Sequence, residues 1–301
     1  MIALQQMCVL FAMMLIGYIA FRAGYLTEPV SVKLSSIVVN IANPALILTS
    51  VSDFKNVQTA DLTVAAAAAA VTYALLILTS CFIPDLLRVK KSDRPSYRLM
   101  CVFNNVGFMG LPIIQTMYGK QALLFAAVFI FFYNILIYTF GVKILRADGD
   151  LVVFLRDILN PGVIACLAAL LIMLCRIKIP TLGASIFTMC GNLTAPLSMM
   201  CIGASFGCFR FRELFCKWKL ILFSLLKLLV IPALGILLMR PLIQNRLILD
   251  IALIVLATPV GSMTTMLAQQ YGADYQVTSQ GIALSTVLSI VTIPLIMTFW
   301  G

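Results

Sequence analysis

The sequence predicts an all-α polytopic membrane protein with ten transmembrane helices. Hydrophobic residues make up 62% of the 301 residues and charged residues only 11%, and the mean hydropathy is +1.07. Water-soluble domains do not have this composition. A helix needs roughly 20 mostly apolar residues to cross a bilayer core about 30 Å thick, and short polar connections divide the chain into ten stretches of that kind.

The predicted spans follow one another along the whole chain. The first is expected to be retained, because the segment before it has neither the basic residues nor the cleavage pattern of a signal peptide. The nine cysteines include no C-x-x-C pair, so we interpret them as small apolar residues rather than disulfides or metal ligands. The ten spans are Leu4–Phe21, Ser31–Val51, Leu62–Ile83, Tyr97–Met117, Leu123–Ile144, Leu151–Cys175, Leu182–Phe206, Leu220–Met239, Leu247–Gln269 and Val277–Trp300.

The basic residues predict the orientation of these spans. Fourteen lysines and arginines fall in alternate connections and six in the others, so by the positive-inside rule the first group is cytoplasmic and both termini face outward. The net charge of +10 is therefore topology information, and it does not indicate a nucleic-acid partner. The predicted cytoplasmic residues are Arg22, Lys33, Arg88, Lys90, Lys91, Arg94, Arg98, Lys143, Arg146, Arg156, Arg210, Arg212, Lys217 and Lys219.

Matching patterns in the two halves predict an inverted repeat. Spans 2 and 7 each carry an asparagine four residues before a proline, and spans 4 and 9 each carry Gly and Pro and lead into a Tyr-Gly pair. Because five spans are an odd number, the second half enters the membrane from the opposite side. We therefore predict one five-helix repeat over residues 1–147 and an inverted one over 148–301. The matched pairs are Asn40 with Pro44, Asn192 with Pro196, Tyr118 with Gly119, and Tyr271 with Gly272.

Spans 4 and 9 are predicted to be broken helices that cross. Proline and glycine weaken a helix, and broken backbone at membrane depth is tolerated only inside protein or beside a water-filled cavity. The N-termini of half-helices carry partial positive charge and suit a carboxylate. The alternative is simple kinks and close packing. The predicted binding residues are Asn104, Asn105, Gly107, Gly110 and Pro112 in span 4, and Thr258, Pro259, Gly261 and Ser262 in span 9.

Amides in two other spans complete the predicted substrate site. Asn40 and Asn43 in span 2, and Asn192 and Thr194 in span 7, either line the same cavity or hydrogen-bond between helices, and the sequence leaves both readings open. Of these, Asn43 and Asn192 are assigned to the predicted site. Lys227 in span 8 either attracts an anionic substrate or snorkels to the cytoplasmic surface. We favour snorkelling, because Lys227 lies about seven residues from the cytoplasmic end of the span.

Several kinds of chemistry are excluded by what the chain lacks. It has no histidine, and its eleven acidic residues lie in connections or near span ends, so a proton relay through the membrane is not expected. A sodium ion held by carbonyls and hydroxyls stays open as the coupling ion, and no other cofactor is expected. Without a P-loop, a metal-ligand cluster or a general base, the sequence does not predict an enzyme.

Five stretches resemble the auxin efflux carrier family in its bacterial form, which lacks a long central loop. This family belongs to the bile/arsenite/riboflavin transporter superfamily. The likeness covers essentially the whole chain. The stretches are NNVGFMGLP at 104–112, NPALIL at 43–48, NPGVIA at 160–165, ATPVGSMTTMLAQQYGAD at 257–274 and LSTVLSIVTIP at 284–294.

The resemblance implies a fold similar to the bile-acid:sodium symporters, with helices 4 and 9 crossing at Pro112 and Pro259. Helices 1, 2, 6 and 7 would form a scaffold domain that dimerises, and helices 3–5 and 8–10 a moving transport domain. Family substrates are organic anions: indole-acetic acid in the plant branch, and malate, malonate or other carboxylates proposed in bacterial branches. The short connection near Asp148 argues against auxin.

We therefore expect a secondary transporter in the plasma membrane that carries a small organic anion by an elevator-type movement. A sodium-coupled symporter or cation exchanger of the same fold is the first alternative. A receptor or scaffold that transports nothing is the second. The expected partners are the carboxylate substrate, the lipid bilayer and a second copy of the chain.

Overall fold

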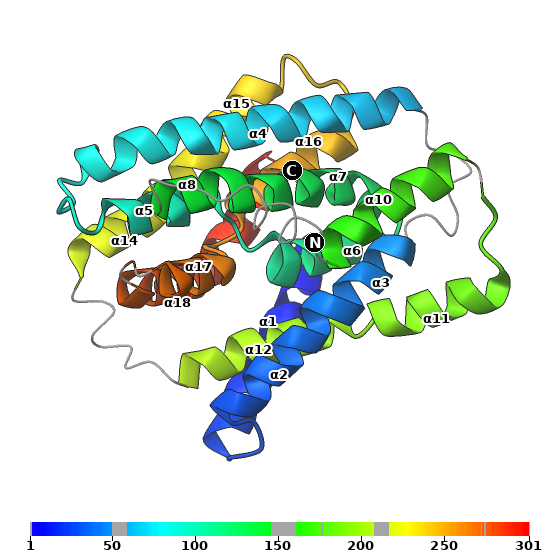
Figure 1. The fold of residues 1–301 in the computed structure, drawn as a ribbon, viewed down its shortest axis with the longest axis horizontal. Coiled ribbons are helices and arrows are strands. Elements are labelled where there is room, and N and C mark those ends of the chain that lie inside the picture. The colour runs from blue at the N-terminus through cyan, green and yellow to red at the C-terminus, as the bar shows by residue number, and fades with distance from the viewer. Residues whose placement is uncertain are drawn as a thin grey trace. The chain divides into compact units, whose positions relative to one another are not determined.

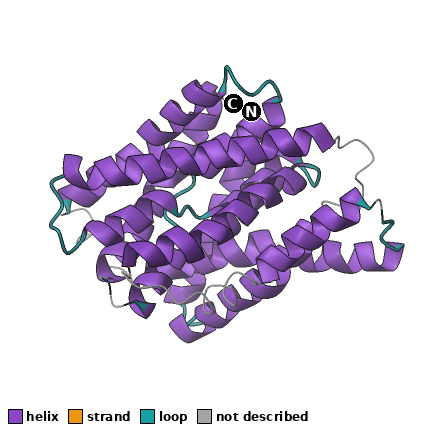
Figure 2. Ribbon diagram, turned by 45° about the horizontal axis from the view of Figure 1, so that its top comes forward, coloured by secondary structure: helices purple, strands orange, loops and turns teal. Residues whose placement is uncertain are grey.

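The computed structural model describes residues 2–49, 59–145, 161–175, 177–207, 217–271, 273 and 275–300. In this part of the chain helices and short loops account for the structure (Figure 2), apart from one isolated β-bridge. The chain divides into two compact units. Unit 1 comprises residues 1–65, 107–131 and 159–209, and unit 2 comprises 66–106, 132–158 and 210–301. The predicted repeat boundary at residues 147 and 148 lies outside the described residues, and the inverted repeat stays a prediction.

Unit 1 is built around two helices that approach each other closely. Helices α1 (Ile2–Arg22) and α12 (Thr194–Gly207) make the most extensive helix contact in the chain (Figure 1). A side chain on Gly17 or Gly203 would strike the backbone of the facing helix, so glycine is required at both positions. Unit 1 also contains α2 (Glu28–Ile37), η1 (Val38–Ala42), α3 (Asn43–Thr49), α6 (Leu111–Tyr118), most of α7 (Ala122–Leu136), α10 (Pro161–Leu174) and α11 (Thr181–Gly191).

Unit 2 is organised around the C-terminal helix α18 (Tyr275–Trp300), which packs against its neighbours along most of its length. Its neighbours include α17 (Figure 1), and also α16, α14 and the π-helical turn η4. Helix α16 is buried from Ile248 to Ala257, and all of these residues except Asp250 are apolar, as expected for the interior of a helical bundle. The unit contains most of α4 (Thr59–Leu86), α5 (Arg94–Val102), η3 (Ile137–Gly141), α8 (Val142–Leu145), α14 (Trp218–Leu225), η4 (Leu226–Val230), α15 (Ile231–Met239), α16 (Arg246–Ala257), α17 (Met263–Gln270) and α18.

The described helices are those of a multi-pass membrane protein. Six of them are long and apolar enough to cross a bilayer, and three shorter apolar helices accompany them. This confirms the predicted class, whereas the total of ten crossings stays a prediction. The six are Glu28–Thr49, Ala60–Leu86, Ala122–Leu145, Thr181–Ala204, Trp218–Met239 and Gln276–Trp300, and the three are Cys8–Arg22, Val106–Tyr118 and Pro161–Ile172.

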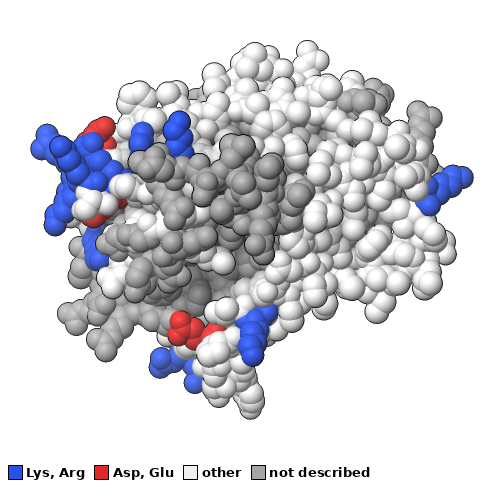
Figure 3. Space-filling view, viewed as in Figure 1, with Lys and Arg blue, Asp and Glu red and all other residues white. Residues whose placement is uncertain are grey.

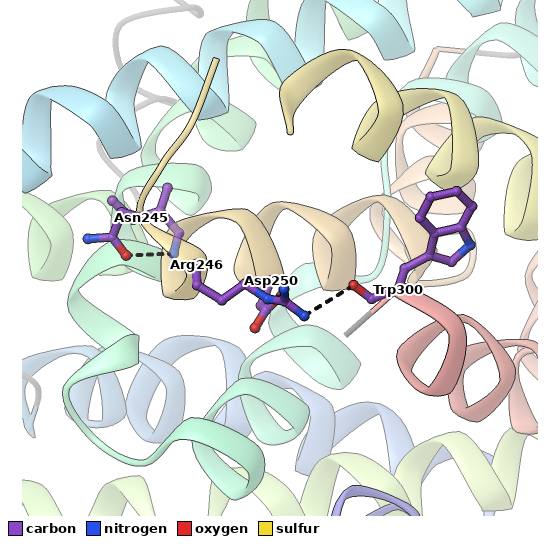
Figure 4. Close-up of polar contacts among 5 residues, drawn as sticks. Asn245, Arg246, Asp250 and Trp300 are labelled. Atoms are coloured by element: carbon purple, nitrogen blue, oxygen red, sulfur yellow. Dashed lines mark hydrogen bonds and ion pairs between the residues drawn. The ribbon is translucent and has the colours of Figure 1, made fainter. Parts of the chain in front are cut away.

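Charged residues of unit 2 form contacts in two places. Lysines and arginines gather over the turn between α4 and α5 (Figure 3), and the Lys219 ammonium reaches that turn by donating to the Arg88 carbonyl at 2.7 Å. Elsewhere in the unit, Arg246 at the start of α16 pairs with Asp250 at 3.2 Å and donates to the Trp300 carbonyl at 3.5 Å (Figure 4). Asp250 is therefore a buried carboxylate with a partner, close to the end of its span as predicted.

Candidate functional site at the helix breaks

Span 4 is interrupted, as predicted, but over a shorter stretch. Helix α5 ends at Val102, Phe103 takes an extended conformation, and helical structure resumes at Val106 in the π-helical turn η2 (Val106–Gly110). The glycines and Pro112, which we expected to be unwound, lie in this turn and in α6. The unwound part is therefore limited to Phe103, Asn104 and Asn105.

Pro112 is not at the crossing, and the expectation that it would be is wrong. It occupies the first turn of α6, with Gly110 at the preceding N-cap. The π-helical turn η2 leads directly into α6, so Pro112 lies within a helical stretch that runs from Val106 to Tyr118. The unwound part of the span therefore precedes Pro112 and does not include it.

Span 9 is interrupted at the expected place. Helix α16 ends at Ala257, Thr258 is extended with φ −66° and ψ 145°, and α17 begins at Met263. The Thr258 hydroxyl donates to the Val255 carbonyl at 2.8 Å, which satisfies an acceptor in the last turn of α16. Ser262 is exposed at the start of α17, and its carbonyl accepts from Thr265 N at 3.2 Å.

The two interruptions meet in an antiparallel bridge between Asn104 and Val260. Asn105 N donates to the Pro259 carbonyl at 2.8 Å, and Gly261 N donates to the Phe103 carbonyl at 2.9 Å. The broken helices thus satisfy each other's backbone, as the apolar surroundings of a membrane protein require. Pro259 is therefore at the crossing, where the resemblance placed it.

Two further groups hold the crossing together. The Val260 N–H, which faces away from the bridge, donates to the Ser285 hydroxyl of α18 at 3.1 Å. A methyl group on Gly261 would lie 2.7 Å from the Asn104 carbonyl oxygen, so only glycine allows the two segments to approach this closely.

The Asn104 side chain is fully engaged inside the protein. Its amide nitrogen donates to the carbonyls of Val255 at 2.5 Å and Leu256 at 3.4 Å, at the end of α16. Its oxygen accepts from the Lys227 ammonium at 2.5 Å. Asn104 therefore joins three parts of unit 2. Asn105 is also buried, and its backbone belongs to the bridge.

Lys227 does not snorkel, so the favoured sequence reading is wrong. Its side chain is fully buried in η4, and the ammonium donates to the Cys101 carbonyl at 2.8 Å as well as to Asn104. A buried charge needs polar partners, and here the carbonyl end of α5 and an amide provide them. Both partners lie more than 120 residues away in the sequence. The position of Lys227 within span 8 could therefore not reveal them.

Unit 1 contains a second group of polar side chains. Asn43 begins α3 and is buried, and its side-chain oxygen has no hydrogen-bond partner. Its side-chain nitrogen would lie 3.2 Å from a methyl group on Gly107, so Asn43 faces the η2 turn. Gln115 of α6 donates to the exposed Asn192 at 3.4 Å, and Lys120 donates to the Thr188 hydroxyl at 3.2 Å.

Four functional candidates in these two groups were not predicted: Ser285, Gln115, Lys120 and Thr188. The sequence did contain a signal for Gln115. It lies three residues after Pro112, and residues three apart lie on the same face of a helix. Ser285 gave none, because serines that bond within their own helix are common in apolar helices and look the same in sequence.

Six apolar helices of spanning length, together with two interrupted helical segments that are joined by their backbones, are typical of polytopic membrane transport proteins. The family model described as "Membrane transport protein" matches residues 2–297, and the chain belongs to this family. It is also similar to an uncharacterised transporter of Methanocaldococcus jannaschii, with 24% identity over 319 aligned positions that cover 100% of this chain and 98% of the relative. The resemblance to the auxin efflux carrier family is thereby confirmed, and the protein is a membrane transporter rather than an enzyme.

Proposed function

We propose that the protein is a secondary carrier for small organic anions, with carboxylates as its main substrate class. The observation that carries this proposal is the bridge between Asn104 and Val260. Irregular backbone is costly at membrane depth, and paired broken helices are where secondary transporters bind their substrates. Family membership supports the same conclusion.

The direction of the half-helices favours an anion. Both first halves, α5 and α16, end just before the bridge, and both second halves, which begin at Val106 and Met263, start just after it. Helix C-termini carry partial negative charge, and Lys227 already offsets it at the end of α5. The N-termini carry partial positive charge, which attracts a carboxylate.

Asn43 is the side chain that we assign first to the substrate. An amide group offers two donors and one acceptor, and the acceptor of Asn43 is buried without a partner. A buried polar atom of this kind costs free energy unless a ligand or water satisfies it. The donors suit a carboxylate, and the acceptor suits a hydroxyl on the same molecule. A side chain on Gly107 would crowd Asn43, because its first carbon would lie 3.2 Å from the Asn43 amide nitrogen.

We further propose that transport proceeds by movement of one unit against the other, in the plasma membrane and as a homodimer. The separation of the chain into two compact units supports such a movement. The resemblance to carriers with a dimerising scaffold supports the oligomeric state. Two predicted outer segments, the start of α16 and the C-terminus, lie together in unit 2, which supports their placement on the same side of the membrane.

A thermal-shift screen of the purified protein tests this proposal. We expect at least one member of a panel of mono- and dicarboxylates to raise the melting temperature of the wild type, and Asn43→Ala to lose most of that shift. The matched control is Asn40→Ala, because Asn40 lies one turn earlier but is exposed and bonds to Ser36 of its own helix. An equal shift in Asn43→Ala would show that the site is assigned wrongly, and no shift with any carboxylate would favour the receptor or scaffold alternative.

A further inference from the structure

The oxygen atoms around Lys227 are of the type that binds a metal cation. The ammonium contacts a backbone carbonyl oxygen, from Cys101, and an amide oxygen, from Asn104. Carbonyl and amide oxygens are the neutral ligands that hard cations take in proteins. Both oxygens lie at the break, beside the carbonyl end of α5, where partial negative charge collects.

The orientation of the Asn104 oxygen is fixed by the protein. Because the amide nitrogen donates to the carbonyls of Val255 and Leu256, the oxygen has to face the other way, toward Lys227. The oxygen pair is therefore built in advance for a positive charge. Two of the three ammonium protons of Lys227 are used by this pair.

No carboxylate among the described residues of the surrounding elements competes for the ammonium. Helices α14, α15, α16 and α18 pack around η4, and within their described residues the only acidic side chain is Asp250, which is paired with Arg246. The other charged residue on these helices is Lys219, whose ammonium bonds to the Arg88 carbonyl. The α5 side contributes only the arginines Arg94 and Arg98. The charge of Lys227 is thus offset by dipoles alone.

We propose that the Lys227 ammonium is a resident cation of the crossing, which occupies the two oxygens of Cys101 and Asn104 in place of a metal cation such as Na⁺. Its ammonium links the end of α5, through Asn104, to the end of α16. The carrier then keeps the broken helices joined without binding Na⁺ at this position. The consequence for transport, that carboxylate uptake needs no sodium, rests on the proposed function. The cation site itself does not.

The test measures thermal unfolding in sodium chloride and in choline chloride at equal ionic strength. The wild type is expected to melt at the same temperature in both. Lys227→Ala removes the ammonium and leaves both oxygens beside an open space, so we expect its melting temperature to fall and to recover by about 5 °C as Na⁺ is raised to saturation. Lys227→Met fills the space with an apolar chain of similar length, and we expect no response to Na⁺. Lys219→Ala serves as the control lysine.

Two results would overturn the inference: a wild type that Na⁺ stabilises more than choline does, or a Lys227→Ala variant that folds without responding to Na⁺. The wild-type comparison decides the question even if every Lys227 variant fails to fold. Since none of these measurements uses a carboxylate, they stand apart from the proposed function. A wild type that is insensitive to Na⁺ and also binds no carboxylate would refute the function and keep the cation site.

Discussion

At the residue scale, the crossing depends most directly on Gly261. The approach of this residue to the Asn104 carbonyl leaves no room for a side chain. We predict that Gly261→Ala lowers the stability of the protein by about 1–3 kcal/mol, the usual cost of forcing a methyl group into a packed interior. Thermal unfolding in detergent measures this loss, and uptake should fall with it because the bridge is displaced.

Gly183→Ala is the matched control for this prediction. A methyl group on Gly183 would meet only the side chain of Ile179, at the ordinary contact distance of 3.4 Å. The variant should therefore melt close to the wild type. If Gly261→Ala behaved in the same way, the two segments would not be held as closely as the structure shows.

Individual roles at the break could be predicted only in part. In span 9, Pro259 and Gly261 lie where the backbone leaves the helix, as predicted. In span 4, Asn104 lies there, whereas Gly107, Gly110 and Pro112 lie in the helical structure that follows. What each residue does depends on partners from distant parts of the chain. The Asn104 oxygen is bound by Lys227, 123 residues away, so no local pattern could show that this amide is engaged inside the protein.

At the scale of elements, the π-helical turns were not predicted. Four of them, η1, η2, η3 and η4, lie within apolar helices. A π-turn adds one residue to a helical turn and changes which side chains face inward beyond it. Lys227 lies in such a turn, and Ser224 is the only other polar side chain in its predicted span Leu220–Met239. Apolar composition identifies a span, but in a helix that is apolar all round it does not record the extra residue.

Helix α18 supports the crossing through one hydroxyl group. The Ser285 hydroxyl accepts from the buried Val260 N–H. This N–H faces away from the bridge, so the backbone of the other segment does not accept from it. We predict that Ser285→Ala destabilises the protein by about 1–3 kcal/mol, the cost of leaving a buried donor unsatisfied. The measurement is again thermal unfolding in detergent.

Ser224→Ala provides the comparison. Ser224 is equally buried, but its hydroxyl donates to the Leu220 carbonyl of its own helix, which also has its regular helical bond. This variant should lose much less stability than Ser285→Ala. Equal losses in the two variants would mean that α18 does not hold the unwound segment.

At the scale of the whole molecule, composition alone was enough to predict a polytopic helical membrane protein. Each compact unit takes segments from both halves of the chain, which span counting does not reveal. The proposal of a scaffold and a moving domain came from the resemblance to a family. Hydropathy could not predict these two domains, because it shows which segments are apolar and not which of them pack together.

The proposed topology has its own test. We predict that alkaline phosphatase fused after Trp300 is active, because this reporter folds only outside the cytoplasm and the C-terminus is expected there. A fusion after Lys91, in the basic turn between α4 and α5, should be inactive (Figure 3). An inactive fusion after Trp300 together with an active fusion after Lys91 would show that every span has the opposite orientation.

Transport of a carboxylate by the purified protein is the most direct test of the proposed function. Wild-type protein in liposomes loaded with unlabelled carboxylate should accumulate the labelled compound from outside, equally well in sodium and in choline buffers. Asn43→Ala should reduce this exchange and Asn40→Ala should not, because only Asn43 presents a buried, unsatisfied amide oxygen. Exchange no faster than in empty liposomes across the whole carboxylate panel, with protein that still unfolds cooperatively on heating, would contradict the assignment as an organic-anion carrier.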